Sequence, residues 1–155
     1  MFKYADTLVT FREIPEEITL CINISNCPNN CPGCHSPWLA KDIGIELTKD
    51  ELKELINSNK GISCICLMGG DINPKEINEL ALFLKQTTNL KVGWYSGKQM
   101  LPKEIDLHNF DYVKLGPYQE QDGPLTERTT NQVLFKIDHI RGDYFVTDIT
   151  AKFWK

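Results

Sequence analysis

The sequence lacks several features that mark large classes of proteins. No run approaches the roughly 18 consecutive apolar residues of a membrane-spanning helix. No lysine- or arginine-rich segment occurs and the formal net charge is −4, so a nucleic-acid-binding surface is not expected. The amino-terminal residues show no signal-peptide layout of charged and then apolar residues. We therefore expect a cytoplasmic protein that binds neither nucleic acid nor membrane.

The chain has 155 residues and shows no internal repeat or low-complexity segment. This length is typical of one domain, because domains usually hold roughly 100–200 residues. Hydrophobic residues make up 41% of the chain and charged residues 25%, as in ordinary globular proteins. The sequence thus predicts a single domain over residues 1–155.

The six cysteines fall into two groups. Disulfides are not expected in a cytoplasmic protein, where thiols are kept reduced. Three cysteines lie in a loop rich in proline, asparagine and glycine, which is typical of a metal site, and three lie in apolar runs, where they read as small buried hydrophobes. The loop cysteines are Cys27, Cys31 and Cys34, and the others are Cys21, Cys64 and Cys66.

Apolar patterning predicts strands that alternate with helices. Thr48 with Glu51 forms a capping box before one helix, and Asn73 followed by Pro74 opens a second. The predicted strands are 17–25, 62–68, 90–97 and 111–116, then 131–137 and 143–149 after a long polar stretch, 117–130. Strand–helix–strand units predict right-handed crossovers and a parallel sheet.

In parallel sheets, the loops that follow the carboxyl ends of the strands carry the functional site. The cysteine loop follows the first predicted strand and Gly69-Gly70-Asp71 follows the second. Ser96 ends the third strand, and Lys114 lies near the end of the fourth. We expect these segments to meet on one side of the sheet.

The cysteine spacing is C-x3-C-x2-C, which supplies three thiolates and no fourth. His35 directly follows Cys34 in the sequence, which makes it an unfavourable fourth ligand of the same metal site. His108 and His139 lie in unrelated segments. A site with three protein ligands keeps one coordination position open. Two plainer readings remain: a zinc site completed by a distant histidine, and three incidental loop cysteines.

The cysteine motif after the first predicted strand resembles the radical S-adenosylmethionine superfamily. Within it, "CPGCHSPW" with "GGD", "YSG" and "GPLTERTTNQ" is similar to the anaerobic (class III) ribonucleoside-triphosphate reductase activating proteins, over about residues 8–137. Gly33 stands where an aromatic residue is common in the superfamily, and "CPGC" is typical of the reductase activating proteins. The resemblance implies an α/β fold, a partial and laterally open (β/α) barrel of parallel strands, truncated relative to a TIM barrel, as a single radical S-adenosylmethionine domain over residues 1–155.

The resemblance also implies two cofactors. A [4Fe–4S] cluster would be bound by the three loop cysteines, and S-adenosylmethionine would bind its open iron. The implied cofactor-binding residues are Gly33, His35, Gly69, Gly70 and Asp71, with Asp71 meeting the methionine ammonium. Ser96 and Lys114 are further candidates for the ribose and the carboxylate, although Lys114 also reads as a solvated surface lysine.

The implied activity is that of an oxidoreductase that activates another enzyme. Reductive cleavage of S-adenosylmethionine gives a 5′-deoxyadenosyl radical, which takes a hydrogen atom from a glycine of the large subunit of the anaerobic ribonucleotide reductase. The electron would come from a donor such as flavodoxin or ferredoxin. We assign the stretch 117–130 to partner docking or to covering the site, since long loops are often functional.

Two other classes of function stay open. One is a different small radical enzyme, which activates another glycyl-radical protein or modifies a small heterocycle. The other is a protein without catalytic activity, either an iron–sulfur electron carrier or a zinc-binding interaction module. This second class predicts a fourth protein ligand and no cofactor pocket.

Overall fold

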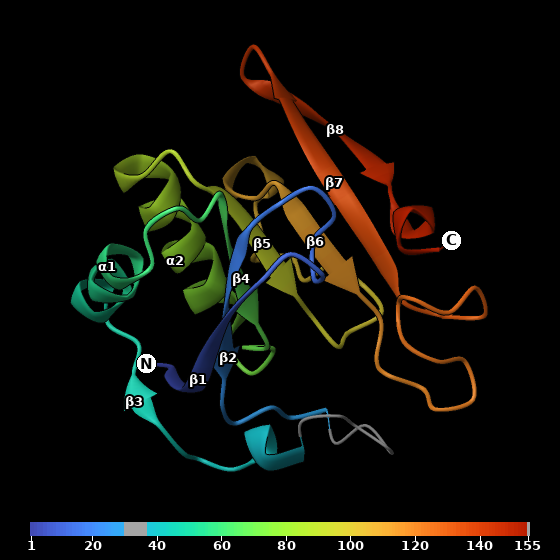
Figure 1. The fold of residues 1–155 in the computed structure, drawn as a ribbon, viewed down its shortest axis with the longest axis horizontal. Helices are drawn as coiled ribbons and strands as arrows, with labels where there is room; N and C mark the ends of the chain where they lie inside the picture. Colours follow the sequence, from blue (N-terminus) through green and yellow to red (C-terminus); the bar gives the residue numbers. More distant parts are fainter. Residues whose placement is uncertain (30–36, 155) are drawn as a thin grey trace.

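One mixed sheet organises the fold. The computed structural model describes residues 1–29 and 37–154, and within them eight strands pair in the order β3-β1-β2-β4-β5-β6-β7-β8 (Figure 1). The strands are β1 (Lys3–Thr10), β2 (Thr19–Ile24), β3 (Ile45–Glu46), β4 (Cys64–Met68), β5 (Lys91–Tyr95), β6 (Tyr112–Leu115), β7 (Val133–Ile140) and β8 (Asp143–Asp148). The helices of the described residues are α1 (Lys49–Ser58) and α2 (Pro74–Thr87), with 3₁₀ turns η1 (Pro37–Ala40), η2 (Leu107–Asn109) and η3 (Thr150–Phe153).

The centre of the sheet is parallel, as the sequence predicts. Strands β2, β4, β5 and β6 pair in this order and all run the same way. Both predicted helix caps are confirmed, because Thr48 Oγ1 accepts a hydrogen bond from Glu51 N at 3.0 Å and Asn73 Oδ1 accepts one from Glu76 N at 3.2 Å. Because β2, β4, β5 and β6 run the same way, their carboxyl ends lie along one edge of the sheet.

The predicted partial (β/α) barrel is wrong. Strand β1 pairs antiparallel with β2 and β3 with β1, while β7 pairs antiparallel with β6 and β8 with β7. The connection from β5 to β6 contains only the 3₁₀ turn η2, and β6 returns through a loop to the β7–β8 hairpin. Without a helix after each strand the parallel pattern cannot continue, so the antiparallel strands extend the sheet instead of closing it.

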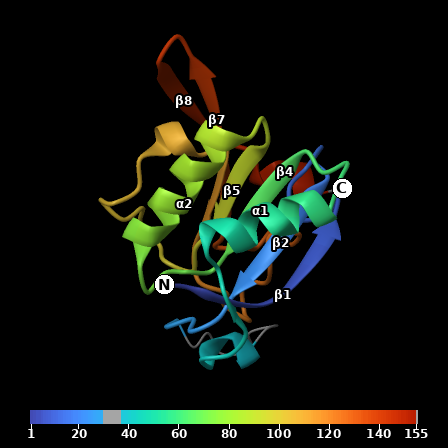
Figure 2. The same cartoon turned by 90° about the vertical axis from the view of Figure 1, so that its left-hand side faces the viewer.

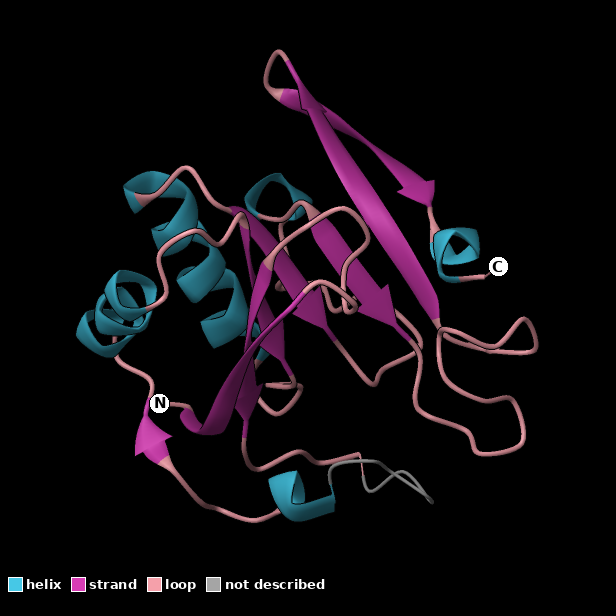
Figure 3. Cartoon of the chain, in the orientation of Figure 1, coloured by secondary structure: helices cyan, strands magenta, loops and turns pink. Residues whose placement is uncertain are grey.

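The two faces of the sheet are covered differently. In Figure 2 both helices lie in front of the strands, and Leu52 of α1 and Ile77 of α2 belong to the larger apolar core on that face. A smaller apolar cluster, which includes Ile14, Leu125 and Ile149, covers the opposite face. Figure 3 shows that loop, not helix, joins β6 to β7, and Leu125 from this loop is buried.

The strand cysteines are part of the smaller cluster. Cys21, Cys64 and Cys66 are buried, which confirms their reading as small buried hydrophobes. Burial raises the pKa of the Cys21 thiol to about 12 and the pKa of the Cys66 thiol well above its ordinary value. These thiols are therefore protonated and unreactive at neutral pH.

Neither α1 nor α2, the α-helices of the described residues, is long and apolar enough to cross a membrane.

Candidate functional site

The cysteine loop leaves β2 at a sharp turn. Asn26 takes the left-handed conformation, with φ of 60°, which asparagine tolerates better than most residues. The backbone nitrogen of Cys27 then donates to the carbonyl oxygen of Leu39 at 2.7 Å. Cys27 is partly buried and stands at the carboxyl end of the central strands.

The remaining predicted residues of this loop, Cys31, Gly33, Cys34 and His35, lie outside the described residues.

Asp71 is the centre of the hydrogen-bond network at this edge of the sheet. It is only 7% exposed, and its Oδ1 accepts a hydrogen bond from Ser96 Oγ at 2.5 Å. Its Oδ2 accepts from Asn29 Nδ2 at 2.6 Å and from Gly97 N at 2.8 Å. One carboxylate thus joins the cysteine loop to the segments that follow β4 and β5.

Gly69 and Gly70 are required by the fold itself. Both have left-handed backbones, with φ of 104° and 84°, a region that favours glycine. A Cβ atom at Gly70 would lie 2.5 Å from Cδ1 of Ile77 in the core. Gly69 N donates to Tyr95 O at 3.0 Å and Gly69 O accepts from Trp94 Nε1 at 2.6 Å, so its backbone is engaged with β5.

Ser96 and Lys114 lie on adjacent strand ends. Ser96 N donates to the carbonyl oxygen of Lys114 at 2.9 Å, and Ser96 Oγ also accepts from Lys98 N at 3.0 Å. Lys114 is only 9% exposed, so its reading as a solvated surface lysine is wrong. Its Nζ lies 5.7 Å from the centroid of the Tyr95 ring, a cation–π contact on the face opposite the helices.

Glu13 is a residue of this region that the sequence analysis missed. Burial raises the pKa of its carboxyl, and the positive charge of Lys114 partly opposes this rise. A partly buried carboxyl and a buried lysine thus share one polar region. The loop between β1 and β2 brings Glu13 there, and no local motif marks it.

Asn29 is the second residue that the sequence analysis missed. Its Nδ2 donates to Asp71 Oδ2 and also lies 3.6 Å from Cys27 Sγ, as a hydrogen bond to sulfur. A Cβ atom at Gly97 would lie 2.5 Å from Asn29 Nδ2, so the glycine makes room for this amide. The available signals were an asparagine between the first two cysteines and a glycine after Ser96.

The described donor groups suit an iron–sulfur site better than a hard metal ion. Cys27 offers a soft thiolate, and a side-chain amide donates to its sulfur, which is a common feature around iron–sulfur clusters. Among the described residues, no group of three or more His, Cys, Asp or Glu side chains can hold a metal ion. His108 and His139 are engaged elsewhere, with Asp106 Oδ1 at 2.7 Å and with the carbonyl oxygen of Phe110 at 2.7 Å.

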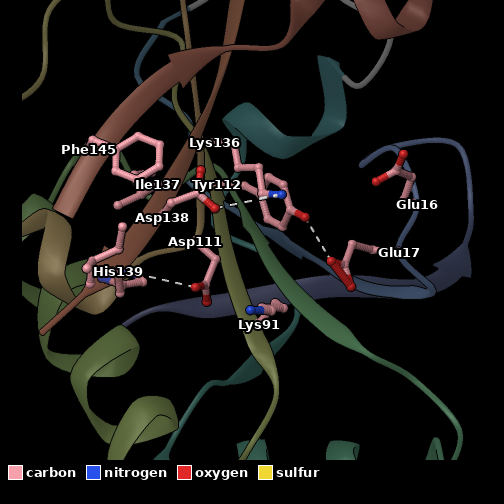
Figure 4. A pocket seen from close by; sticks show the side chains of 11 residues that line it. Glu16, Glu17, Lys91, Asp111, Tyr112, Lys136, Ile137, Asp138, His139 and Phe145 are labelled. Atoms are coloured by element: carbon pink, nitrogen blue, oxygen red, sulfur yellow. Dashed lines mark hydrogen bonds and ion pairs between the residues drawn. The ribbon is translucent and has the colours of Figure 1, made fainter.

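A cavity of about 420 Å³ lies away from this site, at the amino ends of β5 and β6 (Figure 4). Some of its polar side chains pair with one another: Tyr112 Oη donates to Glu17 Oε2 at 2.8 Å, and Lys136 Nζ lies 3.8 Å from Asp138 Oδ1. None of the predicted site residues lines it. We therefore interpret it as the polar closure of the amino end of the sheet.

No family model matches the chain, no curated protein matches it, and no solved structure matches it.

Proposed function

We propose that this protein is a small radical S-adenosylmethionine enzyme that installs a glycyl radical on the large subunit of an anaerobic ribonucleotide reductase. The observation that carries the proposal combines the C-x3-C-x2-C spacing with the position of its first cysteine. Cys27 begins a loop that Asp71 ties to the carboxyl ends of parallel strands, through Asn29. The proposal needs loops that meet at this edge, and it does not need a barrel.

The proposed cluster ligands are Cys27, Cys31 and Cys34, which leave one iron open for S-adenosylmethionine. When bound, these two groups supply the one-electron cleavage of the carbon–sulfur bond of the sulfonium. The cluster potential and the geometry of cleavage then depend on what the chain places around them.

Asp71 is the proposed partner of the methionine ammonium. An ionised carboxylate offers about four acceptor positions, and among the described residues Ser96, Asn29 and Gly97 take three of those on Asp71. These residues leave one position for a cationic donor, and a charge-assisted hydrogen bond there is stronger than a neutral one. Asp71 would thus orient the cofactor and the cysteine loop at the same time.

Lys114 and Glu13 are proposed to line the approach to the cofactor on the face without helices. The Lys114 ammonium lies against the Tyr95 ring and suits a carboxylate, as the resemblance implies for the methionine group. Gly33 and His35 remain cofactor-binding residues by resemblance. Gly69 and Gly70 would act through the backbone shape that positions Asp71.

The partner in this proposal is a protein loop that carries the target glycine. The stretch 117–130 is proposed to cover the site on the face of the sheet without helices. Its Leu125 packs into the smaller apolar cluster on that face. Internal hydrogen bonds, such as that from Thr130 Oγ1 to Gly123 O at 3.1 Å, hold its shape. The proposal includes a cytoplasmic location, a flavodoxin or ferredoxin as electron donor, and neither nucleic acid nor membrane as partner.

The first test is cofactor cleavage. The protein is loaded anaerobically with iron and sulfide, reduced, and given S-adenosylmethionine, and 5′-deoxyadenosine is measured by liquid chromatography. We expect cleavage by the wild-type protein and none by Cys27→Ala. A fully loaded and reduced wild-type cluster that yields no 5′-deoxyadenosine overturns the radical function and favours the electron carrier or the zinc module.

The second test is radical transfer. The activated protein is mixed with the anaerobic reductase large subunit, and the glycyl radical is sought by electron paramagnetic resonance. Cofactor cleavage without a glycyl radical overturns the reductase assignment and leaves another small radical enzyme as the function.

A further inference from the structure

The amide of Asn29 lies between a predicted cluster ligand and a buried carboxylate. Its Nδ2 is 3.6 Å from Cys27 Sγ and 2.6 Å from Asp71 Oδ2. A side-chain amide carries two N–H donors on this nitrogen, so both contacts can be made together. Asn29 therefore presents one N–H to the sulfur while the other is bound by Asp71.

The neighbours of Asn29 determine which end of the amide faces the sulfur. Asp71 Oδ2 already accepts from Gly97 N at 2.8 Å, and an ionised carboxylate only accepts hydrogen bonds. The amide oxygen of Asn29 would be repelled at this position, so the nitrogen must occupy it. Asp71 thus sets the orientation that aims a donor, not an acceptor, at Cys27 Sγ.

The close approach of Gly97 restricts the position of the amide further. A Cβ atom at Gly97 would lie 2.5 Å from Asn29 Nδ2 and 3.5 Å from Asp71 Oδ2. An added methyl group would therefore displace the amide first. The Asn29 amide is confined between Gly97, Asp71 and Cys27.

We propose that Asn29 is a positioning residue that raises the reduction potential of the iron–sulfur cluster through its hydrogen bond to the Cys27 sulfur. This inference rests on the proposed function, since it requires a cluster on Cys27. Reduction adds negative charge to the iron and to its thiolate ligands. A hydrogen-bond donor to a ligand sulfur stabilises this charge and makes the cluster easier to reduce. Asp71 acts through Asn29 by holding its amide in place.

The test is a potentiometric titration of the cluster in the absence of S-adenosylmethionine. Electron paramagnetic resonance monitors the reduced cluster at each potential. Asn29→Ala removes the donor, and Gly97→Ala keeps the asparagine but displaces its amide, whose Nδ2 would lie 2.5 Å from the added Cβ atom. We expect both variants to have a more negative potential than the wild type. At a fixed donor potential the ratio of reduced to oxidised cluster should fall about tenfold, which equals about 59 mV for one electron. Gln99→Ala, an exposed change in the segment that follows β5, should leave the potential unchanged.

The outcomes separate this inference from the proposed function. An unchanged potential in fully loaded Asn29→Ala overturns the inference alone. If Asn29→Ala does not hold a cluster, Gly97→Ala decides, and an unchanged potential there overturns it. A second readout is the magnetic coupling of the reduced cluster to ¹⁵N-labelled asparagine, which should weaken in Gly97→Ala. A wild-type protein that assembles no cluster overturns both statements, whereas one that holds a cluster without cleaving the cofactor overturns only the radical function.

Discussion

Ser96 Oγ donates a 2.5 Å hydrogen bond to Asp71 Oδ1, and this contact joins the segments that follow two neighbouring parallel strands. Both side chains are buried, so neither can exchange this bond for one to water at low cost. The same Asp71 carboxylate holds Asn29 of the cysteine loop. The position of the Asn29 side chain thus depends on a contact between the segments that follow β4 and β5.

The first prediction concerns Asp71. Asp71→Ala leaves the Asn29 amide, the Ser96 hydroxyl and the Gly97 N–H without their acceptor. We expect the free energy of unfolding of the cluster-free protein to fall by about 2–4 kcal/mol, measured by urea denaturation. Asp71→Asn should cost less, because its amide oxygen can keep two donors while its nitrogen donates to Ser96.

The control for Asp71 is Glu120→Ala, which removes an exposed carboxylate and should leave the stability unchanged. Equal stability of Asp71→Ala and the wild type would contradict the role of Asp71 as the centre of this network.

The second prediction concerns Gly70. Gly70→Ala combines a left-handed backbone with a Cβ atom 2.5 Å from Cδ1 of Ile77, so we expect a loss of about 1–3 kcal/mol in the free energy of unfolding. Gly61→Ala is a matched control, since Gly61 has φ of 92° but nothing within 4 Å of an added Cβ. The difference between the two variants in thermal or urea denaturation measures the packing effect. A larger loss for Gly61→Ala would disprove the explanation from core packing.

The third prediction concerns the ion pair of Lys85 and Asp111. Lys85 Nζ pairs with Asp111 Oδ2, which also accepts from Val92 N at 2.9 Å. Lys85→Met leaves the buried carboxylate without its ammonium partner, and we expect the free energy of unfolding to fall by about 2–4 kcal/mol. Adding Asp111→Asn removes the uncompensated charge and should recover part of this loss in a double-mutant cycle. Strictly additive effects would show that the pair is not coupled.

The fourth prediction is a pH dependence from His108. Its pKa is raised above 6.5, chiefly by the hydrogen bond between its Nδ1 and Asp106 Oδ1 at 2.7 Å. A raised pKa in the folded state stabilises the fold fully below the unfolded pKa, and this stabilisation is lost as pH rises through the folded pKa. The difference in unfolding free energy between the wild type and His108→Gln should therefore shrink between about pH 6 and pH 8. A difference that grows with pH would have the wrong sign.

The fifth prediction concerns the strand thiols. Burial raises the pKa of Cys21 to about 12, and it raises the pKa of Cys64 and Cys66 as well. Because the thiolate is the reactive form, iodoacetamide at about pH 8 should leave all three unmodified in the folded protein. Peptide mass spectrometry should find them alkylated only after unfolding, and Cys27 provides the partly exposed reference. Labelling of Cys66 as fast as Cys27 would contradict the structure.

Much of the central fold was predictable because its signals are local. The capping box of Thr48 and Glu51 and the asparagine cap at Asn73 mark the helix starts within a few residues. The parallel pairing of β2, β4, β5 and β6 follows from the crossovers that join the first three, since strand–helix–strand units favour it. The alignment of Cys27, Asp71 and Ser96 on one edge follows from the same rule.

At the edges of the sheet, the strands β7 and β8 were predicted, but β1, β3 and the antiparallel pairing were not. Strand β1 has a mixed burial pattern and a register shift between Tyr4 and Asp6, so no clean alternation marks it. The predicted strands 90–97 and 111–116 already have no predicted helix between them, and the structure has only the turn η2 there. The antiparallel strands that replace the barrel pattern beyond β6 become visible only in the folded sheet.

The sequence by itself determined the central strands, the helices and the order in which polar segments follow the strands, because propensity, capping and apolar periodicity act over a few residues. Only the tertiary structure decided that antiparallel strands extend the sheet and that Asn29 meets both Cys27 and Asp71. The contact between Asn29 and Asp71 spans 42 positions of the chain. Such a contact depends on the register of whole strands and on the space left by Gly97, and no short stretch of sequence contains either.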